Sequence, residues 1–173
     1  MSPILSRTDQ KIVETLIKGV LLSASTDIVL DSLWEQARDS YFCRKYIASV
    51  LVSGACAEAA LRFYCDDVGV SKSKLRMSLV DLIRYSVRAK IIPPEVGRAL
   101  NIVRLNYRNP WVHIDLDKIT QSGTGDSIEA LVLTQSHALD CLWLTAITIS
   151  TLYGSQPVLI DRSLRNFAEC LLD

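Results

Sequence analysis

Hydrophobic side chains recur at three- and four-residue steps along most of the chain, which is the spacing of one face of an α-helix. Residues 6–22 show this simply, with one apolar stripe formed by Ile12, Val13, Leu16, Ile17, Val20 and Leu21. The same spacing predicts helices over 27–40, 41–65, 74–90, 94–109, 127–154 and 161–172. Strand-like alternation is scarce, although 156–160 is compatible with an extended segment. The pattern predicts one all-α domain over 1–173, folded as a helical bundle.

Two of these segments differ in how much of their surface is apolar. Residues 41–65 are apolar on nearly all sides, which predicts a central helix buried on most faces. Glu58 is an acid within this segment, and a buried charge is rarely unpaired. It is predicted either to orient a functional arginine or to form an ion pair with any arginine that faces the bundle. Residues 74–90 are instead amphipathic, with arginines off the core stripe.

Composition is consistent with a packed globule. The chain has 173 residues, of which 49% are hydrophobic, and this excludes a disordered chain. The longest apolar candidate for a membrane span, 138–154, contains Asp140, so we expect a buried helix and no membrane segment. The start of the chain does not show the pattern of a secretory signal. These features predict a cytoplasmic protein.

The five cysteines are an odd number and include no C-x-x-C pair. Cys56 and Cys65 lie within an apolar helical segment, so buried free thiols in a reducing compartment are expected. The cysteines and the two histidines do not show the spacing of zinc ligands. The sequence therefore predicts no metal site.

Charge is unevenly distributed although the formal net charge is zero. Residues 71–108 contain nine basic and two acidic side chains, whereas 109–173 contain three basic and eight acidic ones. A positive segment of this kind can attract phosphate, but it is also typical of a solvated helix face paired with acids elsewhere. The basic segment ends at Arg108.

The stretch "LNYRNPWVHID", residues 105–115, follows this change of charge and holds one of the two histidines. Pro110 has no N–H, and its ring would clash with the carbonyl of Asn106 in a straight helix. It also disfavours the helical conformation for Asn109, so we expect the helix to stop or bend there. In an unbroken helix Arg108 and His113 would point about 140° apart, and a bend would let them converge.

Arginine and histidine together suit phosphate chemistry. Guanidinium offers paired donors to phosphate oxygens and stays charged, and imidazole can take or return a proton near neutral pH. A structural interpretation is also open, in which Arg108 pairs with Asp115 or Asp117 and His113 bonds at a helix end. The spacing alone arises often by chance.

The wider context resembles the HEPN superfamily of small all-α domains. "RNPWVH" is similar to the family signature, an arginine followed four to six residues later by a histidine, with a polar residue after the arginine. "SGACAEAALRFYC" resembles the apolar second helix of the family, and "LVDLIRYSVRAKII" resembles the amphipathic helix that follows. The resemblance covers about 41–150, with extra helices before and after it.

Membership implies a metal-independent endoribonuclease without cofactors, often a toxin or defence component, which leaves a 2′,3′-cyclic phosphate. Such proteins usually form homodimers whose two motifs share one cleft. The resemblance implies that Arg108 stabilises phosphorane charge, that His113 is general base or acid, and that Asn109 orients one of them. Other members do not cleave RNA and serve as binding or regulatory modules, so the alternative is a non-catalytic module for a nucleotide or for a protein partner such as an antitoxin-like nucleotidyltransferase.

Residues near the motif have two interpretations each. Arg104 lies one turn before Arg108 and is predicted either to add an RNA phosphate contact or to belong to a solvated stripe. Trp111 can stack on a base, but a core or dimer anchor is the favoured interpretation. Tyr107 and His137 are predicted to lie in the core.

Overall fold

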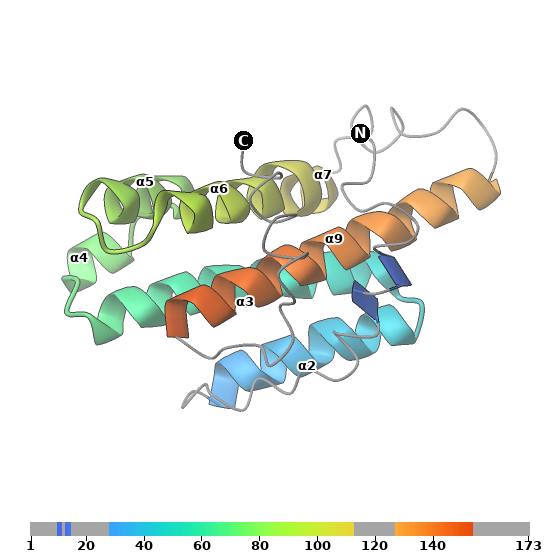
Figure 1. Cartoon of the computed structure of the whole chain (residues 1–173), viewed down its shortest axis with the longest axis horizontal. Coiled ribbons are helices and arrows are strands. Elements are labelled where there is room, and N and C mark those ends of the chain that lie inside the picture. Colours follow the sequence, from blue (N-terminus) through green and yellow to red (C-terminus); the bar gives the residue numbers. More distant parts are fainter. Residues whose placement is uncertain (1–9, 12, 15–27, 113–126, 154–173) are drawn as a thin grey trace.

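The computed structural model describes residues 10–11, 13–14, 28–112 and 127–153 (Figure 1). Across these ranges every regular element is helical, which confirms the all-α class. The elements are α2 (Ile28–Phe42), α3 (Tyr46–Asp67), α4 (Lys72–Leu75), α5 (Leu79–Arg88), α6 (Pro94–Ile102), the π-helix η1 (Val103–Arg108), α7 (Asn109–Val112) and α9 (Ser127–Tyr153). Residues 156–160, the predicted C-terminal helix over 161–172 and most of the helix over 6–22 lie outside the described residues.

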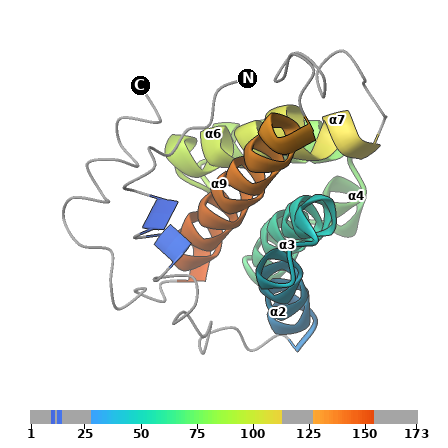
Figure 2. The same cartoon turned by 90° about the vertical axis from the view of Figure 1, so that its right-hand side faces the viewer.

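Helices α3 and α9 form the centre of the fold. Helix α2 packs on α3, and the α6–η1 segment packs on α9 and on α3 (Figures 1 and 2). Helix α7 continues from η1 along the same row (Figure 1). This arrangement places the segment that contains Arg108 directly above the middle of α3.

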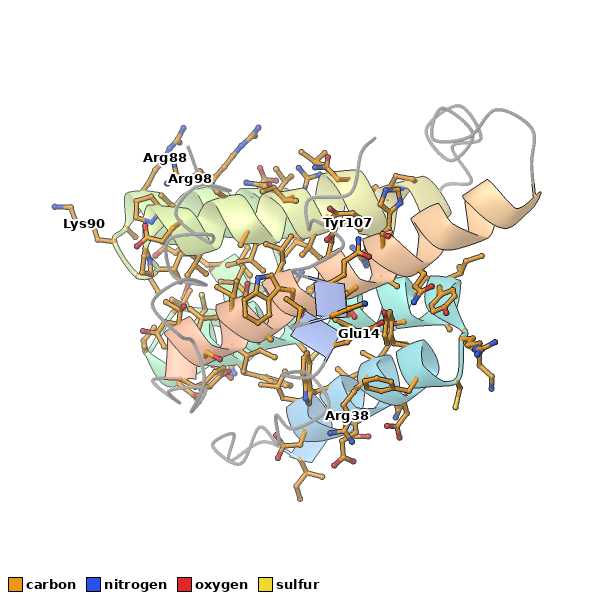
Figure 3. All side chains as sticks on the ribbon, turned by 45° about the vertical axis from the view of Figure 1, so that its right-hand side comes forward. Glu14, Arg38, Arg88, Lys90, Arg98 and Tyr107 are labelled. Atoms are coloured by element: carbon orange, nitrogen blue, oxygen red, sulfur yellow. The ribbon has the colours of Figure 1, made fainter. Side chains whose placement is uncertain are left out.

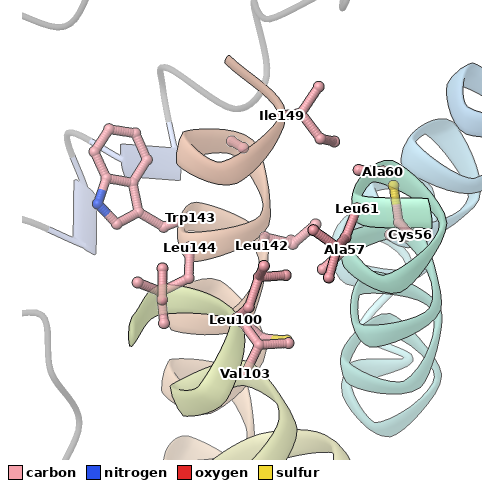
Figure 4. Packing of buried hydrophobic residues seen from close by; sticks show 14 of the residues in the cluster. Cys56, Ala57, Ala60, Leu61, Leu100, Val103, Leu142, Trp143, Leu144 and Ile149 are labelled. Carbon is pink, nitrogen blue, oxygen red and sulfur yellow. The ribbon is translucent and has the colours of Figure 1, made fainter. Parts of the chain in front are cut away.

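The core is formed where these elements meet (Figure 4). Leu142 of α9 lies between Leu61 of α3 and Leu100 of α6, and all three side chains are at most 1% exposed. Burial of one such side chain contributes about 1.5–3 kcal/mol to folding. Thr145 of α9 donates its hydroxyl to the carbonyl of Ser53 at 3.3 Å, which links the two central helices. The apolar pattern of 41–65 and 127–154 thus corresponds to buried central helices, as predicted.

The predicted helix over 41–65 is wrong at its start. Helix α2 continues to Phe42, a turn follows, and α3 begins at Tyr46. Arg44 within the turn has a positive φ of 60°, a conformation that ends helices and is uncommon for residues with a side chain. The apolar pattern runs through this turn because Tyr41 and Tyr46 both pack against the core.

The predicted helix over 74–90 is two helices. Helix α4 ends at Leu75, and α5 begins at Leu79 after its N-cap, Ser78. The Ser78 hydroxyl accepts the backbone N–H of Asp81 at 3.3 Å and donates to the Asp81 carboxylate at 2.6 Å. This is a capping arrangement in which an acid three residues after a serine starts a new helix.

By length and composition alone, α3 could cross a membrane. In this fold it packs against α2 and α9, and half of its most apolar stretch is buried inside the protein. A central core helix accounts for these properties.

The cysteines differ in exposure. Cys56, Cys65 and Cys141 are buried free thiols, as expected for the first two, whereas Cys43 is exposed. Burial raises the pKa of Cys56 to about 12 and also raises the pKa of Cys141 and of Cys65. These three thiols therefore stay protonated and unreactive near neutral pH.

Candidate functional site around Arg108

The chain passes through Pro110 without ending its helix, so the expected stop at Asn109 is wrong and the helix type changes there instead, while the expected bend stays a prediction. Residues Val103–Arg108 form a π-helix, and the N–H of Asn109 bonds to the carbonyl of Arg104, five residues earlier. Asn109 has helical torsions, φ −61° and ψ −41°, which contradicts the expectation that proline moves it out of the helical region. The wider π-helical turn changes the carbonyl positions that Pro110 would otherwise meet.

Arg108 is the last residue of this π-helix, and its side chain lies over Gly54 of α3. A Cβ atom added to Gly54 would lie 2.9 Å from Cδ and 3.1 Å from Cβ and Cγ of Arg108. The arginine stem therefore occupies the space that any larger residue on α3 would fill. The side chain of Arg108 is 29% exposed. Gly54 thus sets how closely η1 approaches α3 and where the guanidinium lies.

The guanidinium of Arg108 reaches Glu58, one turn after Gly54 on the same face of α3. Nη2 of Arg108 lies 3.4 Å from Oε2 of Glu58, whose side chain is 22% exposed. The structure therefore brings together two residues that the sequence singled out separately. An acid at this position fixes the direction of the guanidinium while leaving part of it accessible.

Glu58 also binds a second arginine. Its Oε1 accepts from Nε of Arg62 at 3.0 Å and from Nη2 at 2.7 Å. Arg62 donates as well to the carbonyls of Leu75 and Met77, which ties α3 to the link between α4 and α5. One carboxylate therefore pairs with Arg108 and with a structural arginine, which confirms the ion-pair interpretation of Glu58, while a role in orienting a functional arginine stays a prediction.

Replacing Glu58 with glutamine is expected to lower the free energy of unfolding by about 1–2 kcal/mol, between the values for exposed and buried pairs. The side chain keeps its shape, but two guanidinium groups lose their shared counter-charge. Urea unfolding measures the change. Glu35 on α2 is exposed and provides the matched control, because Glu35→Gln is expected to alter stability by less than about 0.5 kcal/mol. Equal stability of Glu58→Gln and wild type would contradict this account of the ion pairs.

The remaining predicted site residues are only partly placed. Arg104 lies on η1, one turn before Arg108, and Asn109 is half-buried at the start of α7. The backbone of Trp111 belongs to α7, and its side chain lies outside the described residues. His113, Asp115 and Asp117 also lie outside them. The convergence of Arg108 and His113 therefore remains a prediction.

A buried polar pair on the other side of η1 was not predicted as a pair. Tyr107, which is 1% exposed as expected for a core residue, donates its hydroxyl to Asp140 at 3.0 Å (Figure 3). Asp140 is also 1% exposed, and burial together with this carboxylate raises the pKa of Tyr107. The ring of His137 lies 5.6 Å from that of Tyr107, and this side chain is half-buried. The sequence signal was an acid in an apolar helix, which requires a donor from a neighbouring helix.

Tyr107→Phe is expected to destabilise the protein by about 1.5–3 kcal/mol, the usual contribution of a hydrogen bond to a charged group. In this variant the carboxylate of Asp140 would stay buried but would lose one hydrogen-bond donor. Thermal or urea unfolding measures this effect. Tyr85→Phe is the control, because Tyr85 is half-buried and no described residue bonds its hydroxyl. The hydrogen-bond account requires Tyr107→Phe to be clearly the less stable of the two variants.

Within the described ranges, no group of three His, Cys, Asp or Glu side chains is arranged to hold a metal ion. Comparison of the chain with protein-family models, with curated proteins and with solved structures gives no match.

Proposed function

We propose that this protein is a metal-independent endoribonuclease of HEPN type, in which Arg108 and His113 act on one RNA phosphate. The observation that supports this most is the seating of Arg108. A π-helix, Gly54 and Glu58 together fix the stem and one edge of its guanidinium, and the side chain remains partly exposed. An arginine used only as a surface charge would not need this support, and π-helical turns are frequent at functional sites.

In the proposed reaction, His113 accepts the proton of the ribose 2′-hydroxyl as O2′ attacks the neighbouring phosphorus. The O2′–P bond forms, the P–O5′ bond breaks, and the leaving O5′ receives a proton. The products are a 2′,3′-cyclic phosphate and a 5′-hydroxyl end. Arg108 stabilises the charge that develops on the phosphorane oxygens, because its paired donors match those oxygens. Asn109 orients one of the two reacting side chains.

One histidine supplies the base, so the acid for O5′ comes from a second copy of the chain in a homodimer. The two motifs then share a single cleft. A toxin or defence component is the corresponding biological role, and the cytoplasm is the corresponding compartment.

The test is incubation of the purified protein with single-stranded RNA in the presence of EDTA. We expect cleavage that resists the chelator and leaves 2′,3′-cyclic phosphate ends. An RNA with a 2′-deoxy sugar at the cleaved position should remain intact, because the attacking hydroxyl is absent. Cleavage of the deoxy substrate, or 3′-hydroxyl products, would rule out this mechanism.

The contacts of Glu58 favour one second candidate, a non-catalytic module that binds a protein partner or a nucleotide. Glu58 already places a negative charge 3.4 Å from Arg108, and the whole chain has no net charge. Both properties suit a surface for a protein such as an antitoxin-like nucleotidyltransferase. A partner complex that survives high salt, in a preparation that does not cut RNA, would support this candidate, because phosphate-based binding weakens steeply with salt.

A further inference from the structure

Basic side chains outnumber acidic ones over α5, α6 and η1, the helices that lead to the candidate site, and this region is here called the basic surface. Between Leu79 and Arg108 it includes five basic residues besides Arg108 itself, namely Arg84, Arg88, Lys90, Arg98 and Arg104, against the acids Asp81 and Glu95. In Figure 3 the side chains of Arg88 and Arg98 extend away from the same side of the molecule. Within the described part of the chain, Arg84 has the only ion pair among these basic residues.

Arg104 occupies the inner part of this surface. Its Nη2 donates to Oδ1 of Asn101 at 3.3 Å, and its enclosed Nε has no acceptor among the described residues. Burial, and then the nearby charge of Arg84, lower the pKa of Arg104. A guanidinium that is partly buried, close to a like charge and held by one neutral amide is destabilised until an anion joins it.

Arg84 on α5 is a second cation, and its charge acts on Arg104. Its side chain is 65% exposed, and its nearest acid is Asp81 at 4.0 Å, the outer limit of an ion pair. A contact that long in water neutralises little of the charge. The guanidinium groups of Arg84 and Arg104 therefore offer two sets of hydrogen-bond donors, and little of their positive charge is neutralised by neighbouring acids.

We infer that Arg84 and Arg104 form a second phosphate-binding position, which holds a phosphate of single-stranded RNA next to the one at Arg108. This rests on the proposed function for the identity of the polyanion. Arg104 and Arg108 are four residues apart in the π-helix η1, which is close to one of its turns. That separation suits successive phosphates of an extended strand. The position contributes to affinity and register and takes no part in bond cleavage.

The experiment measures binding without cleavage. A fluorescent single-stranded oligodeoxynucleotide has no 2′-hydroxyl, so it reports binding whether or not the protein is a ribonuclease. Its anisotropy is followed at several salt concentrations for wild type, Arg84→Gln, Arg104→Gln and Arg104→Lys. Arg44→Gln, an exposed arginine in the turn before α3, is the matched control for loss of one positive charge.

Arg104→Gln is expected to bind about tenfold more weakly and to lower the slope of log K against log salt by about 0.7, the value for one phosphate contact on a single strand. Arg84→Gln should change both in the same direction, Arg104→Lys should recover most of the slope, and Arg44→Gln should match wild type. Circular dichroism confirms that each variant is folded.

Equal affinity and slope for Arg104→Gln and wild type would overturn the inference, even if RNA cleavage is found. Conversely, absence of cleavage together with the expected slope change would remove the proposed reaction and leave the phosphate position in place. A thermal shift with inorganic phosphate that depends on Arg104, without any such dependence for the oligonucleotide, would overturn the assignment to a nucleic acid strand.

Discussion

Arg108→Ala is expected to lower the rate of RNA cleavage by about 100- to 1,000-fold, the usual loss when one donor to a developing oxyanion is removed. The guanidinium is the fixed positive group of the motif, held by Glu58 at 3.4 Å and by the surface of Gly54. Arg62, the other cation at Glu58 in the described part of the chain, is not free to replace it, because it is engaged with Glu58 and with two backbone carbonyls. His113→Ala should cause a loss of similar size, since it removes the proposed proton acceptor.

Two further substitutions at Arg108 separate charge, geometry and packing. Arg108→Met keeps an apolar stem over Gly54 and should preserve more stability than Arg108→Ala while being equally inactive. Arg108→Lys keeps the charge without the paired donors, so we expect intermediate cleavage. Single-turnover rates and urea unfolding are measured on the same preparations. Cleavage that persists at the wild-type rate in Arg108→Ala would exclude this residue from the reaction.

The sequence correctly predicted those helices whose apolar spacing matches the way they pack in the fold. Apolar spacing over 127–154 corresponds to α9 within one residue, and the segment over 41–65 covers all but the last two residues of the central helix α3. A helix buried on most sides has to be apolar throughout, so its sequence reports its position directly. Chain reversals are weaker signals, because the turn before α3 and the link before α5 both interrupt segments whose apolar residues still face one core.

The π-helix could not be predicted by local rules. Considered alone, Pro110 disfavours a helix at Asn109, and that penalty was the only contribution visible in the sequence. In the folded chain, Val103 and Tyr107 of this segment are both buried, and their packing keeps it helical. The restriction from Pro110 and the packing of the buried side chains are both met, because the helix widens before the proline. Tertiary packing therefore decided between a stop and a change of helix type.

The contacts of Arg108 could be predicted in part from the sequence. Gly54, Glu58 and Arg62 follow one another at four-residue steps, so an α-helix places them on one face. On this face the glycine leaves space beside the helix, and the next position is an acid followed by an arginine. This order suggests that a long cationic side chain from another helix lies across the face. The sequence did not show which arginine fills the gap, because several arginines lie in the later helices and only the fold brings Arg108 to Gly54.

Gly54→Ala is expected to reduce cleavage by about 100-fold, because a displacement of about 1 Å at a reacting group can have an effect of this size. The new methyl group would lie 3.1 Å from Cβ of Arg108, an atom fixed to the backbone, so rotation of the side chain cannot relieve the contact. The backbone at Arg108 has to shift away from α3 by a few tenths of an ångström, and the side chain, whose Cδ lies at 2.9 Å, has to move with it. The loss of folding stability is smaller than overpacking alone would cause, because about 1–3 kcal/mol of overpacking is offset by up to about 1 kcal/mol of helix propensity.

Gly97→Ala is the matched control for Gly54→Ala, because it adds the same methyl group on α6, where the new atom would meet the side chain of Val87 at 2.5 Å. This variant should lose stability and keep its rate per folded molecule. The double variant Gly54→Ala/Arg108→Ala distinguishes direct from indirect effects. If Gly54 acts by positioning Arg108, the glycine substitution adds no further loss of rate once the arginine is gone. An independent, multiplicative loss would show instead that Gly54 affects cleavage through some other part of the molecule.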